Sequence, residues 1–135
     1  MKNKIESTII ITAENQERFI ERCIKSCLNQ SVKNIEIIII FTKLKNINTL
    51  KRRYLSKNIV FLSIQKKINK PTQDQLFKIK QGLLISRGKY IFLLDGDDTY
   101  KKNKVKEAIN SIKNKKVLFL DNYENNKNDI KQINK

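Results

Sequence analysis

The sequence predicts an α/β protein, a three-layer α/β/α sandwich built on a mostly parallel sheet. Several short runs of the chain are almost purely apolar and β-branched, such as STIIIT at 7–12 and IEIIIIF at 35–41, which is typical of strands buried on both faces. These runs alternate with segments whose apolar residues recur at helical spacing. With 135 residues, the chain is long enough for one domain with one core.

Each of the first four predicted strands is followed by a predicted helix. We expect strands at 7–12, 35–41, 59–64, 90–94 and 116–120, and helices at 15–28, 46–56, 72–86 and 103–112. Asn15 is expected to cap the first helix, and Thr72 with Gln75 forms a capping-box pattern at the start of the third. Gly88 is expected to stop that third helix. Its buried side is expected to hold Leu76, Phe77, Ile79, Leu83 and Leu84.

The composition changes near the C-terminus. From residue 122 onwards, Asn, Lys and single Ile residues follow one another without periodicity. We therefore expect one domain over 1–121 and a polar arm or loose tail over 122–135.

The chain is strongly basic, with a formal net charge of +16 from 29 basic and 13 acidic side chains. This charge implies anionic partners, either nucleic acid, an acidic membrane surface or phosphorylated small molecules. A basic nucleic-acid-binding domain is therefore one interpretation. Aromatic residues make up only 7% of the chain and no recognised nucleic-acid-binding motif is present, so nucleic acid is not the expected partner.

No apolar run approaches the roughly 20 residues that a membrane-spanning helix needs. The first residues, MKNKIESTIIIT, have neither the apolar length nor the cleavage site of a signal peptide. We therefore expect a cytoplasmic protein. Cys23 and Cys27 are expected to be reduced core residues, because a zinc site in a chain without His would lack two ligands.

Composition also excludes several kinds of site. Glycine occurs only at 82, 88 and 96, so neither a P-loop nor a dinucleotide-binding turn is present. The absence of His excludes His-based acid–base catalysis, and no Ser or Cys stands in a nucleophile-elbow context.

The stretch YIFLLDGDDT at 90–99 is an apolar strand that ends in three acids, Asp95, Asp97 and Asp98. In parallel α/β folds, ligands bind beyond the carboxyl ends of the strands. Carboxylates at such an end can hold Mg²⁺ or Mn²⁺, which assists the departure of a nucleoside diphosphate.

Two alternatives exist for this acidic stretch. In the first, Asp95 attacks a phosphate and Asp97 acts as acid and base, as in the DxDxT motif of haloacid-dehalogenase-like phosphatases. That family carries its motif on the first strand, whereas this one follows the fourth, so position weighs against a phosphatase. In the second, the stretch is a solvated turn in which Asp98 or Thr99 caps the next helix.

Several stretches resemble the family 2 (GT-A fold) glycosyltransferases, in the correct order and over almost the whole chain. STIIITAEN and FIERCIKSCLNQSVKNIEIIII look like that family's first strand, first helix and second strand. QGLLISRGKYIFLLDGDD looks like its later helix, strand and DxD motif, and VLFLDNYENN like the strand that follows. The resemblance implies the Rossmann-like fold of nucleotide-diphospho-sugar transferases, with this chain as the N-terminal nucleotide-sugar-binding half.

The resemblance also implies roles for individual residues. Asp97 would be the metal ligand, supported by Asp95 and Asp98, and the cofactor would be Mg²⁺ or Mn²⁺. The nucleotide-sugar-binding residues would be Thr12, Ala13, Glu14, Asn15, Thr42, Lys80, Asp95 and Gly96.

The chain departs from the family pattern at three places. An Asp pair usually follows the second strand, where this chain has Phe41 and Thr42, and a Tyr usually follows the first strand, where it has Ala13 and Glu14. The family's catalytic base lies in its acceptor-binding half, beyond the part that matches here, so no catalytic residue is nominated.

The implied reaction is transfer of a sugar from a nucleotide-diphosphate sugar to a saccharide or lipid-linked acceptor, in cell-surface polysaccharide synthesis. It implies peripheral association with an anionic membrane, at its inner face. The alternative within the same family is a truncated or degenerate module that binds nucleotide sugar without catalysis.

Overall fold

The computed structural model describes residues 4–65, 68–112, 123–124 and 130–131. Strands and helices alternate as the sequence predicts. The strands are β1 (Ser7–Glu14), β2 (Ile35–Thr42), β3 (Ile59–Ser63) and β4 (Tyr90–Asp95). The helices are α1 (Ile20–Leu28), α2 (Ile47–Arg53), α3 (Pro71–Ile85) and α4 (Lys104–Ile112). The fifth predicted strand, at 116–120, lies outside the described residues.

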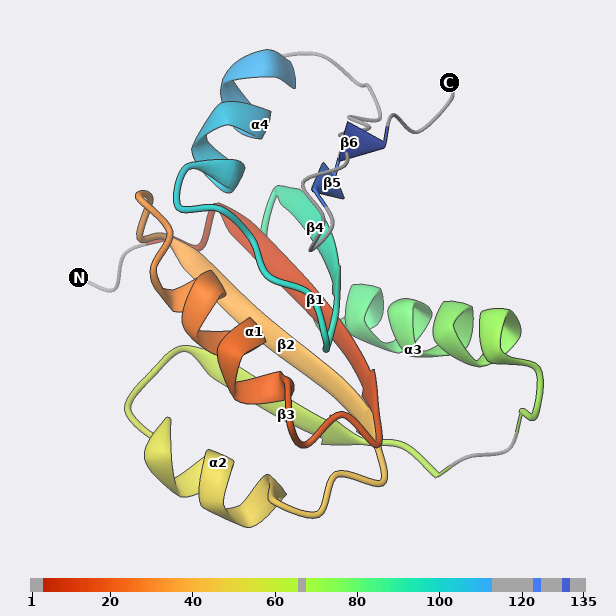
Figure 1. Cartoon of the computed structure of the whole chain (residues 1–135). Helices are drawn as coiled ribbons and strands as arrows, with labels where there is room; N and C mark the ends of the chain where they lie inside the picture. The colour runs from red at the N-terminus through yellow and green to blue at the C-terminus, as the bar shows by residue number, and fades with distance from the viewer. Residues whose placement is uncertain (1–3, 66–67, 113–122, 125–129, 132–135) are drawn as a thin grey trace.

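β1 lies inside the sheet, between β2 and β4. It pairs in parallel with both, and β2 pairs in parallel with β3, which gives the strand order β3-β2-β1-β4. Because the four strands run in the same direction, their carboxyl ends lie at one edge of the sheet (Figure 1). β1 continues past its predicted end as far as Glu14, which pairs with Thr42.

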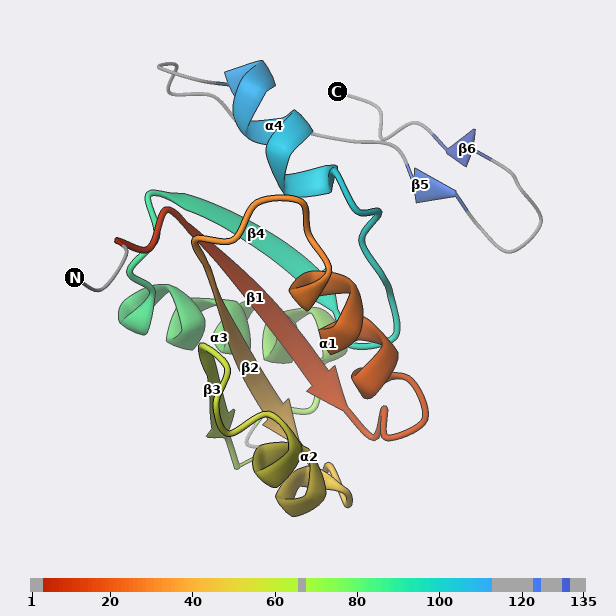
Figure 2. The same ribbon diagram turned by 90° about the vertical axis from the view of Figure 1, so that its left-hand side faces the viewer.

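Helices cover both faces of the sheet, which confirms the predicted three-layer α/β/α architecture. α1, α2 and α4 lie on one face and α3 crosses the other, over β1 and β2 (Figure 2). The first face holds the larger core, formed by Ile9, Ile11, Ile37, Ile39, Phe92 and Leu94 of the strands with Ile20, Ile24, Leu50 and Val105 of the helices. The smaller core under α3 contains Ile10, Ile38 and Ile40.

α1 begins later than the sequence predicts. Asn15 does not cap it; this residue has a φ of 52° and lies in the exposed turn that leaves β1. The helix starts at Ile20, and its N-cap residue Phe19 makes no side-chain capping hydrogen bond. Asn tolerates the left-handed region better than most residues, so Asn15 turns the chain instead of starting the helix.

The capping box predicted for α3 is also absent. The N-cap residue is Lys70, without a side-chain capping hydrogen bond, and Pro71 occupies the first turn. Proline is well suited to that position because its missing N–H would have had no partner in the helix. Gln75 is therefore free of a capping role and points to the carboxyl edge of the sheet.

The buried side of α3 is the opposite of the predicted one. The helix buries Asp74, Lys78 and Gly82. Leu76, Phe77, Leu83 and Leu84 are exposed, and Ile79 is half-buried. A Cβ on Gly82 would lie 2.8 Å from Ile10 Cγ2. The helix thus approaches the sheet so closely that a small residue is required at the crossing point, and its apolar side faces outwards.

A buried carboxylate joins the end of α3 to the sheet. Glu36 of β2 is 1% exposed and accepts hydrogen bonds from the Thr8 hydroxyl and from the backbone N–H and guanidinium of Arg87. Burial raises the pKa of Glu36, but these hydrogen bonds outweigh burial and hold the pKa below its ordinary value.

Gly88 allows the chain to pass close to β1. A Cβ at this position would lie 2.5 Å from the Thr8 backbone nitrogen. The C-cap of α3 is Ser86, so Gly88 serves close packing against Thr8 and does not cap the helix.

Residues 123–124 and 130–131 pair as two short antiparallel strands, β5 (Tyr123–Glu124) and β6 (Ile130–Lys131). The domain boundary at 121 stays a prediction. Within the described part of the chain, no helix combines the length and the apolar character needed to cross a membrane.

The Glu36 network predicts a loss of stability in acid. A carboxylate whose pKa is lowered by folding stabilises the folded state above its unfolded pKa of ~4.3, and this contribution is lost as the pH falls through the folded pKa. We expect Glu36→Gln to lower the free energy of unfolding by about 2 kcal/mol at neutral pH. The difference from wild type should shrink as the pH falls below ~4.3.

Urea unfolding at a series of pH values measures both quantities. The control is Glu107→Gln, which changes an exposed acid in α4 and should leave stability unaltered. A loss in Glu36→Gln that is the same at every pH would contradict the role given to this carboxylate.

Candidate functional site

The carboxyl ends of β1 and β4 form the centre of the site. Thr12 lies opposite Asp95 in the parallel register, and the Gly96 N–H donates to the Thr12 carbonyl at 2.9 Å. A Cβ on Gly96 would lie 2.9 Å from Ala13 Cβ and 2.6 Å from Gln16 Oε1. Glycine at 96 therefore lets the chain turn tightly against β1, and this turn brings four of the predicted residues together.

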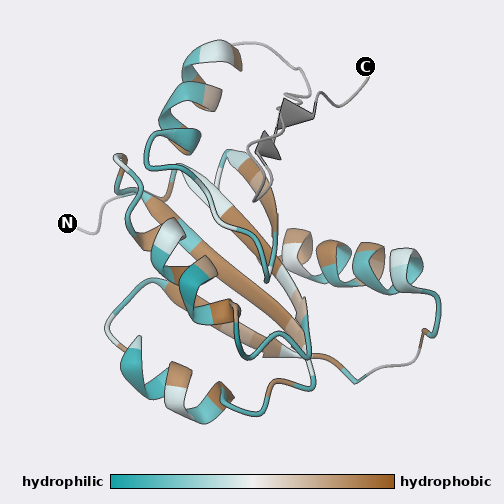
Figure 3. Cartoon of the chain, in the orientation of Figure 1, coloured by the Kyte–Doolittle hydropathy of each residue, from teal (hydrophilic) through white to brown (hydrophobic). Residues whose placement is uncertain are grey.

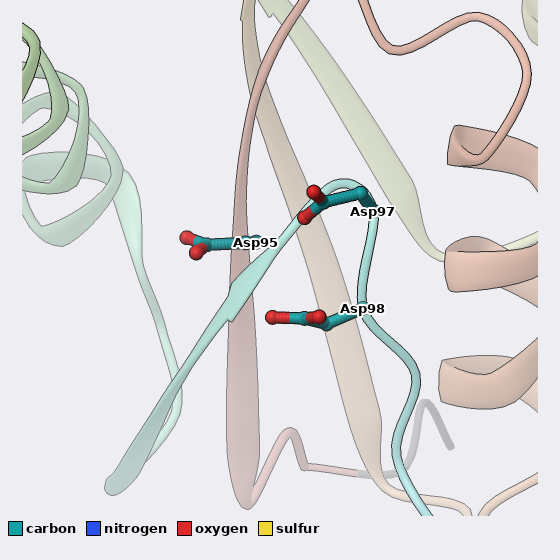
Figure 4. A group of neighbouring side chains, drawn as sticks. All are labelled: Asp95, Asp97 and Asp98. Carbon is teal, nitrogen blue, oxygen red and sulfur yellow. The ribbon is translucent and has the colours of Figure 1, made fainter. Parts of the chain in front are cut away.

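The acid loop (residues 95–98) gathers three carboxylates. One oxygen from each of Asp95, Asp97 and Asp98 lies within 4.8 Å of the others, and all three side chains point to the same side of the loop (Figure 4). The Asp98 N–H donates to the Asp95 carbonyl at 3.0 Å and closes the turn. Exposed acids also occur without an ion, but carboxylate oxygens are the type of ligand that Mg²⁺ and Mn²⁺ prefer.

Burial and mutual repulsion raise the pKa of two of these carboxyls. Burial raises the pKa of Asp95, and the charge of Asp97 raises it further. Burial likewise raises the pKa of Asp98, with the charges of Asp97 and Asp95 adding to the effect. A cation among the three oxygens would relieve this repulsion.

Side chains from two helices hold the acid loop. Gln75 of α3 donates hydrogen bonds to Asp95 Oδ1 and to the Thr12 hydroxyl. Arg22 of α1 donates to the Asp97 carbonyl at 3.0 Å, and its charge acts on Asp98. The sequence did not identify these two as site residues. Gln75 fits a capping box, and Arg22 is one of many basic residues on helical surfaces.

A hollow opens beside the acid loop, between the end of β1 and the first half of α3. It encloses about 210 Å³ and is lined by Thr12, Ala13, Glu14, Gln16, Pro71, Asp74, Gln75, Lys78 and Asp95. Four of the predicted nucleotide-sugar-binding residues are among these. Asn15 and Lys80 are not: Asn15 is exposed in the turn after β1, and Lys80 is exposed on α3.

A buried ion pair lies in the wall of this hollow. Lys78 Nζ donates to Asp74 Oδ2 at 2.9 Å, and the two residues are only 3% and 5% exposed. Burying such a pair carries a desolvation penalty. Sequence reasoning missed it because Asp and Lys at i and i+4 usually form a solvated surface pair. The sequence signal for this pair was Gly82. It lies four residues after Lys78, as Lys78 lies four residues after Asp74, and it marks the side of α3 that packs closely against the sheet.

A second hollow lies where β2 and β3 end. It encloses about 480 Å³ and is lined by Thr42, Lys43, Ile64, Gln65 and Asn69. Thr42 is buried, and its hydroxyl donates to the Ile64 carbonyl at 3.1 Å. Lys43 has a φ of 55°. None of these five lining residues carries a carboxylate, so the structure provides no substitute here for the family's Asp pair.

Comparison with known proteins supports the resemblance. Residues 8–43, which span most of β1 and all of α1 and β2, match the family described as glycosyl transferase family 2. A search of curated proteins by sequence finds no significant match.

Solved structures share the fold. S. aureus TarS matches with a TM-score of 0.65 at 19% identity, over 79% of this chain and 19% of TarS. A structure of S. aureus TarS 1–349 in complex with UDP-GlcNAc gives a TM-score of 0.64 at 18% identity, over 79% of this chain and 32% of that one. The mannosyltransferase PcManGT from Pyrobaculum calidifontis, in complex with GDP-Man and Mn²⁺, gives 0.66 at 12% identity, over 83% and 33%.

At these identities the likeness shows the fold alone, and this chain spans about a fifth to a third of the length of those proteins. The family match covers the first strand–helix–strand unit, and the matched structures extend the same fold over most of the described chain. The predicted resemblance is thereby confirmed: residues 8–43 match the family 2 glycosyltransferases in sequence, and the chain shares the α/β fold of TarS and PcManGT.

Proposed function

We propose that this chain is the nucleotide-sugar-binding part of a family 2-like glycosyltransferase. The observation that carries the proposal is the acid loop beside a polar hollow, at the carboxyl edge of a parallel sheet. TarS has been solved with UDP-GlcNAc and PcManGT with GDP-Man. The shared fold therefore supports a nucleotide-diphosphate sugar as the donor.

The acid loop fits a hard divalent cation. It offers three carboxylate oxygens within 4.8 Å of one another. Burial, and then repulsion among the carboxylates, raises the pKa of Asp95 and of Asp98. Asp97, with Asp95 and Asp98, would hold Mg²⁺ or Mn²⁺, and the PcManGT complex contains Mn²⁺. Such a cation neutralises the charge that develops on a departing nucleoside diphosphate. Arg22 and Gln75 fix the loop from either side.

The hollow beside the loop would hold the rest of the donor. Thr12 and Asp95 present a hydroxyl and a carboxylate to the ribose or diphosphate, and Ala13 and Glu14 line the wall beside them. Asn15 continues the turn that leaves β1, and Gly96 lets the acid loop pass close to β1. Lys78 takes the part that the family resemblance implies for Lys80, because Lys78 lines the hollow whereas Lys80 is exposed on α3.

The base of the nucleotide would lie in the second hollow. The Thr42 hydroxyl is already bonded to the Ile64 carbonyl, so Thr42 shapes this hollow more than it reads the base. Lys43, Gln65 and Asn69 remain as donors and acceptors for polar groups on the base edge.

The acceptor in this proposal is a saccharide or a lipid-linked saccharide of a cell-surface polysaccharide, and the reaction takes place in the cytoplasm at the inner face of an anionic membrane. No residue of the chain is assigned as the catalytic base. A second candidate is a module that binds nucleotide sugar without turnover, which the replacement of the family's Asp pair by Phe41 and Thr42 favours. Hydrolysis of the donor in excess Mn²⁺ would separate the enzyme from the module.

Metal-dependent nucleotide binding is the first test of the proposed function. We expect the wild-type chain to bind a nucleoside diphosphate with Mg²⁺ or Mn²⁺ and not with EDTA. Asp97→Ala should weaken this binding at least about tenfold, because it removes a carboxylate from the cluster. Isothermal titration calorimetry measures the affinity. Glu107→Ala, which removes an exposed acid from α4, is the matched control; equal weakening in both variants, or undiminished binding in EDTA, would contradict the metal site.

The two lysines of α3 give the second test. We expect the double variant Asp74→Asn with Lys78→Met, which removes both buried charges together, to bind the nucleoside diphosphate at least about tenfold more weakly. Lys80→Met should bind like wild type, because Lys80 does not line the hollow. Thermal unfolding shows whether the double variant is folded. If Lys80→Met binds the nucleoside diphosphate more weakly than the folded double variant does, the donor-binding role belongs to Lys80 and not to Lys78.

A further inference from the structure

The outer face of α3 carries exposed apolar side chains that the fold does not explain. Leu76, Leu83 and Leu84 lie on the side of the helix away from the sheet, and Leu84 is 70% exposed. Phe77 and Ile85 of the same helix are also exposed. Figure 3 shows brown, apolar bands on α3 after its polar first turn. Isolated exposed apolar residues are normal, but a continuous apolar stripe marks an interaction surface.

The apolar surface continues onto the free edge of the sheet. Ile91 and Leu93 of β4 pair with Thr8 and Ile10 of β1, so they face the side of the sheet on which α3 lies. Both are exposed, and among the described helices α3, which lies on this side, crosses β1 and β2 and does not cover them. We call the exposed residues of α3 together with Ile91 and Leu93 of β4 the α3 face.

The exposed charges on α3 and at its two ends are positive, although Arg87 is paired with Glu36. Asp95, at the end of β4, is exposed on the same side of the sheet but belongs to the acid loop. Lys80 stands within the apolar stripe, between Leu76 and Leu84, and Lys70, Arg87 and Lys89 flank the helix ends; all four are exposed. The one acid of α3, Asp74, is buried and paired with Lys78. A helix face that combines exposed Leu and Phe with Lys and Arg, and has no exposed acid, matches the surface of an anionic bilayer.

A second copy of the chain is a poorer match for the same face. Self-association through it would bring Lys80 and its basic neighbours against the same charges on the other copy, in a chain that carries +16. An anionic lipid surface instead attracts those charges while its acyl region accepts the leucines.

We propose that the α3 face docks onto the surface of an anionic lipid membrane, with α3 lying in the plane of the interface. This inference rests on the membrane association in the proposed function and identifies the surface responsible for it. The first turns of α3 line the donor hollow through Asp74, Gln75 and Lys78. Docking on the outer side of the same helix therefore places that hollow next to the membrane, where a lipid-linked acceptor would be.

Tryptophan fluorescence tests the docking directly, because the chain contains no Trp. In Leu84→Trp, vesicles of phosphatidylcholine with about 30% phosphatidylglycerol should shift the emission to shorter wavelength at ~0.15 M salt, whereas vesicles of phosphatidylcholine alone should not. The matched control is Leu55→Trp, since Leu55, at 83%, is the most exposed leucine among the described residues. An equal shift in both variants, or a shift in neither, would overturn the proposal.

Co-sedimentation with the same vesicles tests the apolar and basic parts separately. Leu76→Ser with Leu84→Ser should reduce the bound fraction at least about tenfold, as should Lys80→Glu, while Leu55→Ser and Lys106→Glu should bind like wild type. If Lys106→Glu loses as much vesicle binding as Lys80→Glu, the attraction is non-specific, and the proposal that the α3 face binds the membrane is overturned.

Analytical ultracentrifugation of the wild type and the double serine variant separates the protein alternatives. A wild-type dimer that the serine changes convert to a monomer, without any change in vesicle binding, would overturn lipid docking in favour of self-association. These assays contain no nucleotide, so a failure to bind vesicles would not contradict the proposed donor site. A failure to bind the nucleoside diphosphate would likewise not contradict the proposed membrane surface.

Discussion

The parallel pairing of β1 with both of its neighbours is the constraint on which the rest of the molecule depends. It aligns Thr12 with Asp95 across the sheet and lets the Gly96 N–H bond to the Thr12 carbonyl. Parallel strands need crossovers that cover the faces of the sheet, so the same pairing requires α1 on one side and α3 on the other. These are the two helices that supply Arg22 and Gln75 to the acid loop.

The sheet could be predicted from sequence because its central strands bury both faces. Ile37 to Ile40 and Ile9 to Ile11 are almost completely inaccessible to solvent, and only apolar, β-branched residues satisfy that environment. The start of α1 could not be predicted in the same way. Asn15 suits both a helix cap and a left-handed turn, and the choice depends on the direction in which the chain leaves β1, which is a tertiary property.

Part of the candidate site was also visible in the sequence. The acid loop was found because three acids at the end of an apolar strand are unusual in a basic chain, and Thr12 followed from the family pattern. Lys78 was not found, because periodicity alone assigns the apolar side of α3 to the core. The close crossing at Gly82 against Ile10 decides otherwise, since leucines on that side of the helix would not fit between it and the sheet.

α3 is therefore best understood as a helix with two functional sides. The desolvation penalty for the buried Asp74–Lys78 pair is offset only by good geometry, and removal of one partner costs about 3–5 kcal/mol. The exposed leucines on the other side gain nothing from the fold as described. The stability of an isolated domain explains neither the buried ion pair on the inner side nor the exposed leucines on the outer side. Both are explained if the inner side contacts a charged donor and the outer side contacts an apolar, negatively charged surface, because each unfavourable arrangement then has a partner that compensates it.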